Sequence, residues 1–312
     1  MLAFLLEKRR IKMASKVYFT REITPESLIR IYEALGWTPK GKTAIKISTG
    51  EIFNPNSLRP ELIYPLVKKV NGKLVENNTA YEGARQFDVT HKMMIQKHGY
   101  NRAGGVHLLD SDGEIEIPVT NGKHLKSDRV GAGIQDYQSC IMLSHFKGHP
   151  MAGYGGAIKN GSIGFASPSG KARIHSASKS DFRYTGWLGN GKFILPGGDK
   201  AFQESMVEAT SAVFDYFGRE NVICINVMNN LSVDCDCFPF PAAPKMSDYG
   251  IFASFDPVAC DQACLDVIWA QKDAGGADLV KRITNRGGLR QTSYGDEFGL
   301  GSKQYEVIDI DK

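Results

Sequence analysis

The sequence predicts an α/β protein in which helices cover a mostly parallel β-sheet. Short apolar runs that end in polar or glycine residues are typical of buried strands, and segments with helical spacing of apolar residues lie between them. Such alternation favours parallel pairing, because parallel neighbours need a crossover connection, which is usually a helix. At 312 residues, the chain fits either one large domain or two closely joined lobes.

The expected elements follow one another along most of the chain. Strands are expected at 17–19, 44–48, 106–110, 141–145 and 222–228. Helices are expected at 25–35, 60–70, 84–97, 200–217 and 257–271. Asp256 precedes a proline, which is typical of a helix N-cap and assigns Asp256 a structural role. Ligands bind at the carboxyl ends of the strands in open parallel sheets, so we expect the site at that edge.

The composition is that of a folded protein, with 42% apolar and 23% charged residues. The formal charge of +4 is small and the basic residues are scattered, which argues against a nucleic-acid partner. The sequence has no apolar run of about eighteen residues, so no membrane span is expected. Six cysteines without regular spacing favour a reducing compartment, and hence the cytoplasm. We expect a disordered leader at 1–14 and a single α/β domain at 15–312.

The segment HFKGH begins at the last residue of the expected strand at 141–145 and concentrates chemistry-bearing side chains. His145, Lys147 and His149 are the catalytic candidates here. Imidazoles ligate metals or transfer protons near neutral pH, and a lysine holds an anion or forms an imine. The competing interpretation is that strand-end histidines only cap backbone carbonyls.

The segment GYGGAIKN comes next, with a helix expected from about Ala157. Gly155 and Gly156 allow the backbone N–H groups to approach a ligand, and a helix start attracts anions. Lys159, the fourth catalytic candidate, could pair with a carboxylate or phosphate, and Asn160 could donate a hydrogen bond to the same group. The run matches neither the P-loop nor the dinucleotide fingerprint, and tight turns alone also require glycine.

The segment DCDC places two thiols and two carboxylates on consecutive residues, and Asp234, Cys235, Asp236 and Cys237 are the metal candidates. If the segment is extended, the two cysteines face the same side. Soft ligands of this kind suit zinc, copper(I) or an iron-sulfur cluster, and a complete site needs three or four ligands. The rest would come from His145, His149, His175 or Cys140. The alternative is a pair of unligated thiols in an acidic turn.

Further substrate-binding candidates are Asn78 and Tyr81, which follow another expected strand, and His175. Cys260 and Cys264 lie one helical turn apart among apolar residues and are interpreted as core side chains.

These segments, in this order, resemble a family called domain of unknown function 362, often labelled iron-sulfur centre proteins. The resemblance spans nearly the whole chain and is most specific at 77–85, 143–149, 153–160 and 232–237. Many similar proteins carry a ferredoxin-like cysteine insert after the segment equivalent to His175. This chain has no cysteine between Cys140 and Cys224, so their four-iron cluster is not carried over. The resemblance implies that HFKGH, GYGGAIKN and DCDC serve the function that members share.

The leading hypothesis is a metal-dependent or redox-linked, oxidoreductase-like enzyme acting on a small anionic molecule. The DCDC thiols would hold zinc or iron, or exchange electrons with an external carrier, and an iron-sulfur cluster without the ferredoxin motif stays open. The HFKGH histidines would ligate the metal or move protons, while Lys147 and Lys159 neutralise the substrate. Two alternatives are a non-catalytic metal- or metabolite-binding protein and a metal-independent isomerase or hydrolase.

Overall fold

The computed structural model describes residues 14–182, 187–188, 192–193 and 198–312. The expected leader at 1–14 lies outside the described residues except for Ala14. No helix in the described part of the chain is long and apolar enough to cross a membrane.

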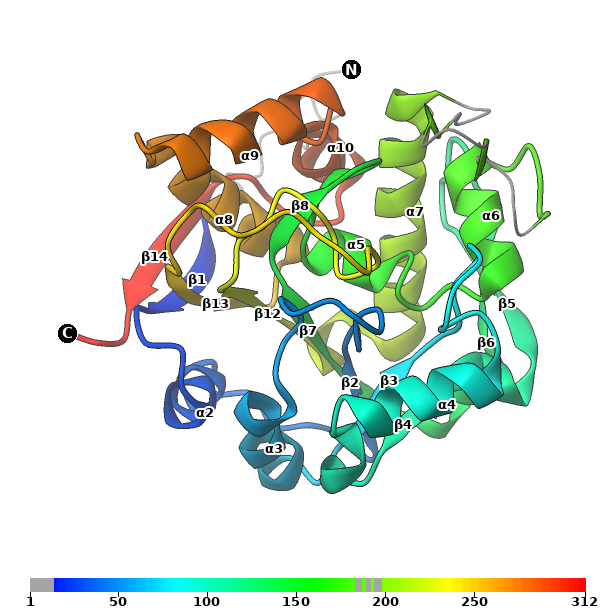
Figure 1. Cartoon of the computed structure of the whole chain (residues 1–312), viewed down its shortest axis with the longest axis horizontal. Coiled ribbons are helices and arrows are strands. Elements are labelled where there is room, and N and C mark those ends of the chain that lie inside the picture. Colours follow the sequence, from blue (N-terminus) through cyan, green and yellow to red (C-terminus); the bar gives the residue numbers. More distant parts are fainter. Residues whose placement is uncertain (1–13, 183–186, 189–191, 194–197) are drawn as a thin grey trace, which may run out of the picture.

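Eight strands within the described residues form one sheet, in the order β14-β1-β13-β12-β7-β2-β3-β4 (Figure 1). Neighbouring strands pair in parallel, except that β13 runs antiparallel to both β1 and β12. The expected α/β class with a mostly parallel sheet is therefore confirmed. The strands are β1 (Ser15–Thr20), β2 (Thr43–Lys46), β3 (Lys73–Glu76), β4 (Val106–Leu108), β7 (Ser139–His145), β12 (Val222–Met228), β13 (Gly250–Ser254) and β14 (Tyr305–Asp309).

Within the described residues, three pairs of short strands form small sheets apart from the main one. They pair β5 (Glu114–Pro118) with β6 (Ser127–Gly131), β8 (Lys147–His149) with β9 (Gly153–Gly155), and β10 (Trp187–Leu188) with β11 (Lys192–Phe193).

Helices cover both faces of the sheet, and each group closes its own apolar core. One face carries α2 (Pro25–Ala34), α3 (Pro60–Lys69) and α4 (Asp88–Lys97). The other carries α5 (Ala157–Gly161), α6 (Pro168–Ser176), α7 (Asp199–Phe217), α8 (Pro257–Ala270), α9 (Ala274–Asn285) and α10 (Arg290–Phe298).

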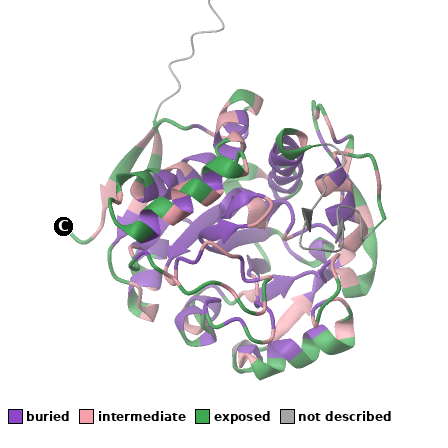
Figure 2. Cartoon of the chain, turned by 45° about the horizontal axis from the view of Figure 1, so that its top comes forward, coloured by how far each residue is buried: buried purple, intermediate pink, exposed green. Residues whose placement is uncertain are grey.

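The side chains of the central strands alternate between the two faces of the sheet, and this explains why the sequences of these strands are almost entirely apolar. In β7, Ile141 and Leu143 join the core under α2 and α3, while Cys140 and Met142 join the opposite core. Successive side chains of a strand point to opposite faces, so a strand covered on both faces must be apolar throughout. Figure 2 shows these central strands as buried.

Asp256 caps α8, as the sequence predicts. Its carboxylate accepts hydrogen bonds from the backbone N–H groups of Val258 and Ala259 at 2.8 and 3.0 Å.

The chain order fixes where a ligand can enter. From β2 the sheet grows through β3 and β4 toward one edge, while from β7 it continues through β12 toward the other. Strands β2 and β7 are parallel neighbours. The order in which the chain adds strands to the sheet reverses between these two. The loops after such a pair leave in opposite directions and open a crevice at their carboxyl ends.

Candidate active site

A cavity of about 630 Å³ lies at this edge of the sheet. Its walls come from the ends of β2, β3 and β7, the β8–β9 hairpin, α5, α6 and the loop that follows β12. Candidates that line it are Tyr81, His145, Lys147, His149, Gly155, Gly156, Lys159, Asn160, His175, Asp234, Cys235 and Cys237. Asn78 and Asp236 are not among the lining residues.

The DCDC segment forms a tight turn, and the extended conformation considered above is wrong. The backbone N–H of Phe238 donates to the Cys235 carbonyl at 3.0 Å, which closes the turn. Inside it, the Cys237 backbone N–H donates to the Cys235 sulfur at 3.4 Å. Asn54 holds the outside of the turn by donating to the carbonyls of Cys235 and Phe238. The turn, rather than strand alternation, brings the two thiols together.

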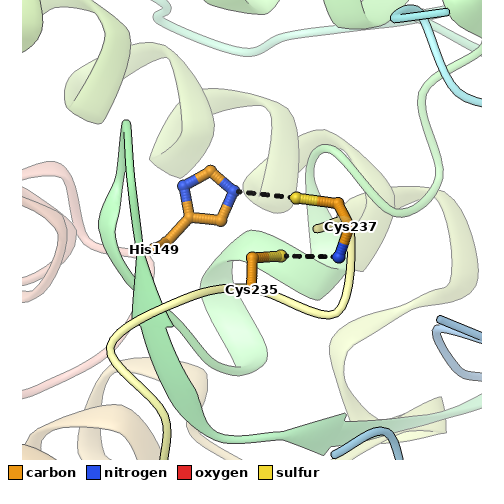
Figure 3. Close-up of side chains that lie close together, drawn as sticks. All are labelled: His149, Cys235 and Cys237. Carbon is orange, nitrogen blue, oxygen red and sulfur yellow. Dashed lines mark hydrogen bonds between the residues drawn. The ribbon is translucent and has the colours of Figure 1, made fainter. Parts of the chain in front are cut away.

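His149 reaches this thiol pair from the β8–β9 hairpin (Figure 3). Its Nε2 lies 4.0 Å from the Cys237 sulfur, and its Nε2 and the two sulfurs all lie within 4.8 Å of one another. The hairpin is pressed against the loop before DCDC, since a Cβ on Gly148 would stand 2.4 Å from the Val233 carbonyl oxygen. Only glycine permits that approach, which sets the distance between the imidazole and the sulfurs.

Backbone hydrogen bonds fix the protonation of the His149 ring. Its Nδ1 accepts from the backbone N–H groups of Met151 and Ala152 at 3.1 and 2.9 Å. A nitrogen that accepts carries no proton, so the neutral ring holds its proton on Nε2. Burial lowers the pKa of His149 to about 4, which keeps the ring neutral at pH 7. The Nε2–H group therefore points at the thiols as a donor.

The two thiols share one negative charge. The hydrogen bond from Cys237 lowers the pKa of Cys235 well below the usual thiol value, and the charge of Lys159 adds to this. The same contact with Cys235 raises the pKa of Cys237. Two thiols in contact titrate as a unit, in which the first proton leaves easily and the second is retained. The lowered pKa of Cys235 favours a thiolate there, and the raised pKa of Cys237 favours a retained proton.

His149, Cys235 and Cys237 could hold a metal ion. Two sulfurs and one imidazole nitrogen are a set that zinc accepts, with a fourth position left for a ligand from the cavity. In this conformation, however, Nε2 carries the proton, and a metal would have to displace it. The carboxylates of DCDC serve elsewhere, because Asp234 accepts from Arg282 at 3.1 Å and Asp236 points to a different pair of cations.

Asp236 lies between His145 and Lys147. Its carboxylate accepts from His145 Nδ1 at 2.8 Å and from Lys147 Nζ at 2.7 Å. His145 Nε2 faces the carbonyl of Asn229 at 2.6 Å, so both ring nitrogens face acceptors and the cationic ring satisfies both. Burial would raise the pKa of Asp236, but the two cations lower it well below the usual range. These three side chains form a buried ionic triad that anchors the thiol turn to the end of β7.

The expectation that the start of α5 is free to bind an external anion is wrong. The backbone N–H groups of Ala157 and Ile158 donate to the Asp261 carboxylate at 2.7 and 3.1 Å. A Cβ on Gly156 would stand 2.3 Å from that carboxylate, so this glycine makes room for Asp261. The helix start binds an anion, as its geometry favours, but the anion is a side chain of α8.

Asn160 joins the two strands at the reversal point of the sheet. Its side-chain N–H groups donate to the carbonyls of Lys46 in β2 and Leu143 in β7, at 3.0 and 3.3 Å. They also donate to the Ser144 hydroxyl at 3.1 Å. These bonds use the donors that the sequence assigns to a substrate.

Lys159 and His175 face the cavity from helices α5 and α6. The Nζ of Lys159 has no hydrogen-bond or carboxylate partner among the described residues. His175 stacks on Phe202 and donates from Nδ1 to the Lys171 carbonyl at 2.6 Å. Burial lowers the pKa of His175 to about 3, so its Nε2 is an unprotonated acceptor.

The segment around Tyr81 belongs to a second buried network. Arg85 binds Glu76 at 2.8 Å and Glu51 at 3.2 Å, and Tyr81 donates to Glu51 at 2.9 Å. Asn78 lies behind this network, where its amide donates to Asp88 at 2.6 Å. Tyr81 thus reaches the cavity wall, whereas Asn78 supports it from outside.

The family model described as Domain of unknown function (DUF362) matches residues 43–266. The chain belongs to the DUF362 family. The residues that line the cavity run from Lys46 to Pro239, so the whole candidate site lies inside the DUF362 segment. Strands β1 and β14 and helices α2, α9 and α10 lie outside it.

Among curated proteins, the DUF362 chain has no significant match. Among solved structures, it is similar to the lactate racemase apoprotein from Thermoanaerobacterium thermosaccharolyticum, with a TM-score of 0.40 and 11% identity. That alignment covers 68% of this chain and 50% of the other, so the match spans half of the racemase. A similarity at this level says nothing of activity.

Sequence reasoning missed several charged residues of this DUF362 site. They are Lys46, Glu51, Glu76, Arg85 and Lys171, all at least nine-tenths buried. Lys46 could have been identified from the sequence, because a lysine in an apolar strand that is covered on both faces is rarely buried without a partner. Lys171 gave none, since a lysine in a polar helix such as α6 is ordinarily exposed.

Proposed function

We propose that this protein is a redox-linked enzyme that acts on a small anionic molecule through the Cys235–Cys237 pair. The observation that carries the proposal is the grouping of both sulfurs with His149 Nε2, within 4.8 Å, at the wall of the cavity. A thiolate is the reactive form of cysteine, and the lowered pKa of Cys235 favours that form.

The proposed step transfers two electrons. The Cys235 thiolate and the Cys237 thiol lose two electrons and one proton in total as their sulfurs join in a disulfide, and an oxidised group of the substrate takes up the two electrons. An external dithiol carrier would then reduce the disulfide and restore the pair. The Nε2–H of His149 supports the first step by stabilising the thiolate. In that role the ring keeps its hydrogen bonds from Met151 and Ala152.

A metal-dependent enzyme is the second candidate, and the same three ligand atoms favour it. It requires His149 to give up its Nε2 proton or to rotate away from the N–H groups of Met151 and Ala152. Zinc or iron would then polarise an oxygen of the substrate from the open coordination position.

The test uses protein purified without oxygen. Elemental analysis, an absorption spectrum and a count of reactive thiols are compared between the wild type and the double variant Cys235→Ser, Cys237→Ser. Cys260→Ala, which removes a core thiol outside the cavity, is the control. A metal-free wild type that gains a Cys235–Cys237 disulfide on oxidation, and loses activity in the double variant, supports the redox enzyme.

Stoichiometric zinc or iron that the double variant lacks would replace the redox proposal with the metal-dependent one. Unchanged turnover in the double variant would refute both and leave an isomerase or hydrolase without metal. A ligand that stabilises the protein thermally but is recovered unchanged under oxidising and reducing conditions would indicate a binding protein.

A further inference from the structure

The cations around the cavity fall into two groups. Lys147 is neutralised by Asp236, and Arg85 by Glu51 and Glu76. Three other lysines line the cavity and form no ion pair with a carboxylate among the residues that the structure describes, namely Lys46, Lys159 and Lys171. Sequence reasoning assigned substrate neutralisation to Lys147 and Lys159, but the buried charge without a counterion lies at Lys46 and Lys171.

Two of these lysines are deeply buried. Lys46 is 2% exposed and Lys171 is 7% exposed. Lys171 Nζ donates to the carbonyls of Asn78 and Ala166 at 2.7 and 2.6 Å, and Lys46 Nζ donates to the Ile47 carbonyl at 2.5 Å. An ammonium group has three N–H donors, so each lysine keeps at least one for a ligand. Burying a charge without a partner is unfavourable, and a bound anion would relieve that cost.

The lysines also act on one another. Burial lowers the pKa of Lys46 to about 8, and that of Lys171 to about 7. These values include the effects of neighbouring cations: Arg85 and Lys159 contribute to lowering the pKa of Lys46, and Lys46 and Arg85 contribute to lowering that of Lys171. The groups that oppose this are Glu76 and Cys140 near Lys46, and Asp110 and Glu76 near Lys171.

We propose that Lys46, Lys159 and Lys171 bind a phosphate group of the substrate, which makes the substrate class a small phosphorylated molecule. Three point charges on separate elements, β2, α5 and α6, suit the several oxygens of a tetrahedral dianion. A planar carboxylate is matched best by a guanidinium fork, and the fork of Arg85 already binds Glu51 and Glu76. This inference rests on the proposed function only in placing the substrate in the same cavity.

Lys159 connects the phosphate site with the thiols. Its charge lowers the pKa of Lys46 on one side and of Cys235 on the other. A phosphate held by the three lysines therefore places the adjacent part of the substrate beside the thiol pair.

The test is calorimetric titration of the full chain with sulfate, which is dianionic from about pH 6 to 9 and therefore reports only the protein's protonation. We expect Lys46→Met, Lys171→Met and Lys159→Gln each to weaken sulfate binding by about tenfold or more, because each removes a charge-assisted hydrogen bond. Lys92→Met, at an exposed lysine outside the cavity, is the charge control. Lys159 is only partly buried, so its variant tests the site even if the other two unfold.

Sulfate binding should also take up protons. Lys171 loses its charge as the pH rises through about 7, and Lys46 as it rises through about 8, so the affinity for sulfate should fall over this range. Because binding takes up protons, the heat of binding at pH 7.5 should change with the ionisation enthalpy of the buffer. Wild-type protein that does not bind sulfate, variants that bind as well as the wild type, or malonate binding more tightly than sulfate would each overturn the proposal.

The double variant Cys235→Ser, Cys237→Ser separates this inference from the proposed function. Sulfate binding that survives in it, together with lost turnover, supports both. Sulfate binding that survives together with unchanged turnover supports the phosphate site and refutes the thiol chemistry.

Discussion

Replacing Asp236 with asparagine removes the negative charge between two buried cations. The carboxylate is 1% exposed and accepts from His145 and Lys147 at 2.8 and 2.7 Å. Removing one partner of a buried ion pair costs about 3–5 kcal/mol, because the remaining charge stays out of water without compensation. The asparagine N–H₂ group would also face a donor, so the cost should lie in the upper part of that range.

The corresponding change in melting temperature follows from the chain length. Unfolding entropy near the transition is about 2.1 cal/mol/K per residue, or about 0.7 kcal/mol/K for 312 residues. A loss of about 4 kcal/mol therefore lowers the melting temperature by about 6 °C. Differential scanning calorimetry and urea unfolding at pH 7 measure the two quantities independently.

Asp234→Asn is the matched control, two residues away in the same turn. Its carboxylate is 21% exposed and binds Arg282 at 3.1 Å, so its loss should cost about 1 kcal/mol or less. Equal stability losses in the two variants would refute the reasoning, because they would show that the charge of Asp236 is not buried against its partners in solution.

Three further predictions concern the helix start and the thiols. Burial raises the pKa of Asp261 to about 6, so the folded state holds this proton more tightly than the unfolded state. The stability advantage of the wild type over Asp261→Asn should therefore fall by about 2 kcal/mol between pH 4 and 7, as urea unfolding would show. A wild type whose advantage grows over that range would contradict it. Gly156→Ala should destabilise the protein by about 1–3 kcal/mol in the same assay, since its Cβ would meet the Asp261 carboxylate at 2.3 Å; no change would mean that α5 can shift freely. Iodoacetamide at pH 7 should modify Cys235 or Cys237 before the other cysteines, and peptide mass spectrometry would identify the modified residue. Early modification of a core thiol would contradict the assigned pKa directions. The core thiols are Cys140, Cys224, Cys260 and Cys264.

Local sequence patterns predicted much of the fold. The strand expected at 222–228 matches β12, and the helix expected at 200–217 matches α7 to within one residue. Strand β12 is apolar except for Asn226, because it is covered on both faces. Helix α7 repeats apolar residues at helical spacing between polar ones. The antiparallel strand β13 and the β8–β9 hairpin were not predicted. Strand partners and direction depend on distant segments, and a three-residue strand has too few positions to show a period.

The candidate site was also predictable only in part. HFKGH and DCDC are dense enough in functional groups to be found from the sequence, and the cavity includes residues of both. The partners of those groups are set by contacts between distant residues. Asp261 fills the start of α5 from 104 positions further along the chain, and no local pattern near Gly156 announces it.

The N–H groups of Met151 and Ala152 have a consequence for how this site can change by mutation. Because main-chain atoms impose the tautomer of His149, most side-chain replacements at these two positions leave its proton where it is. Proline is the exception, since it alone lacks the N–H group. The tautomer of the imidazole therefore depends on the backbone at these two positions and not on which side chains they carry.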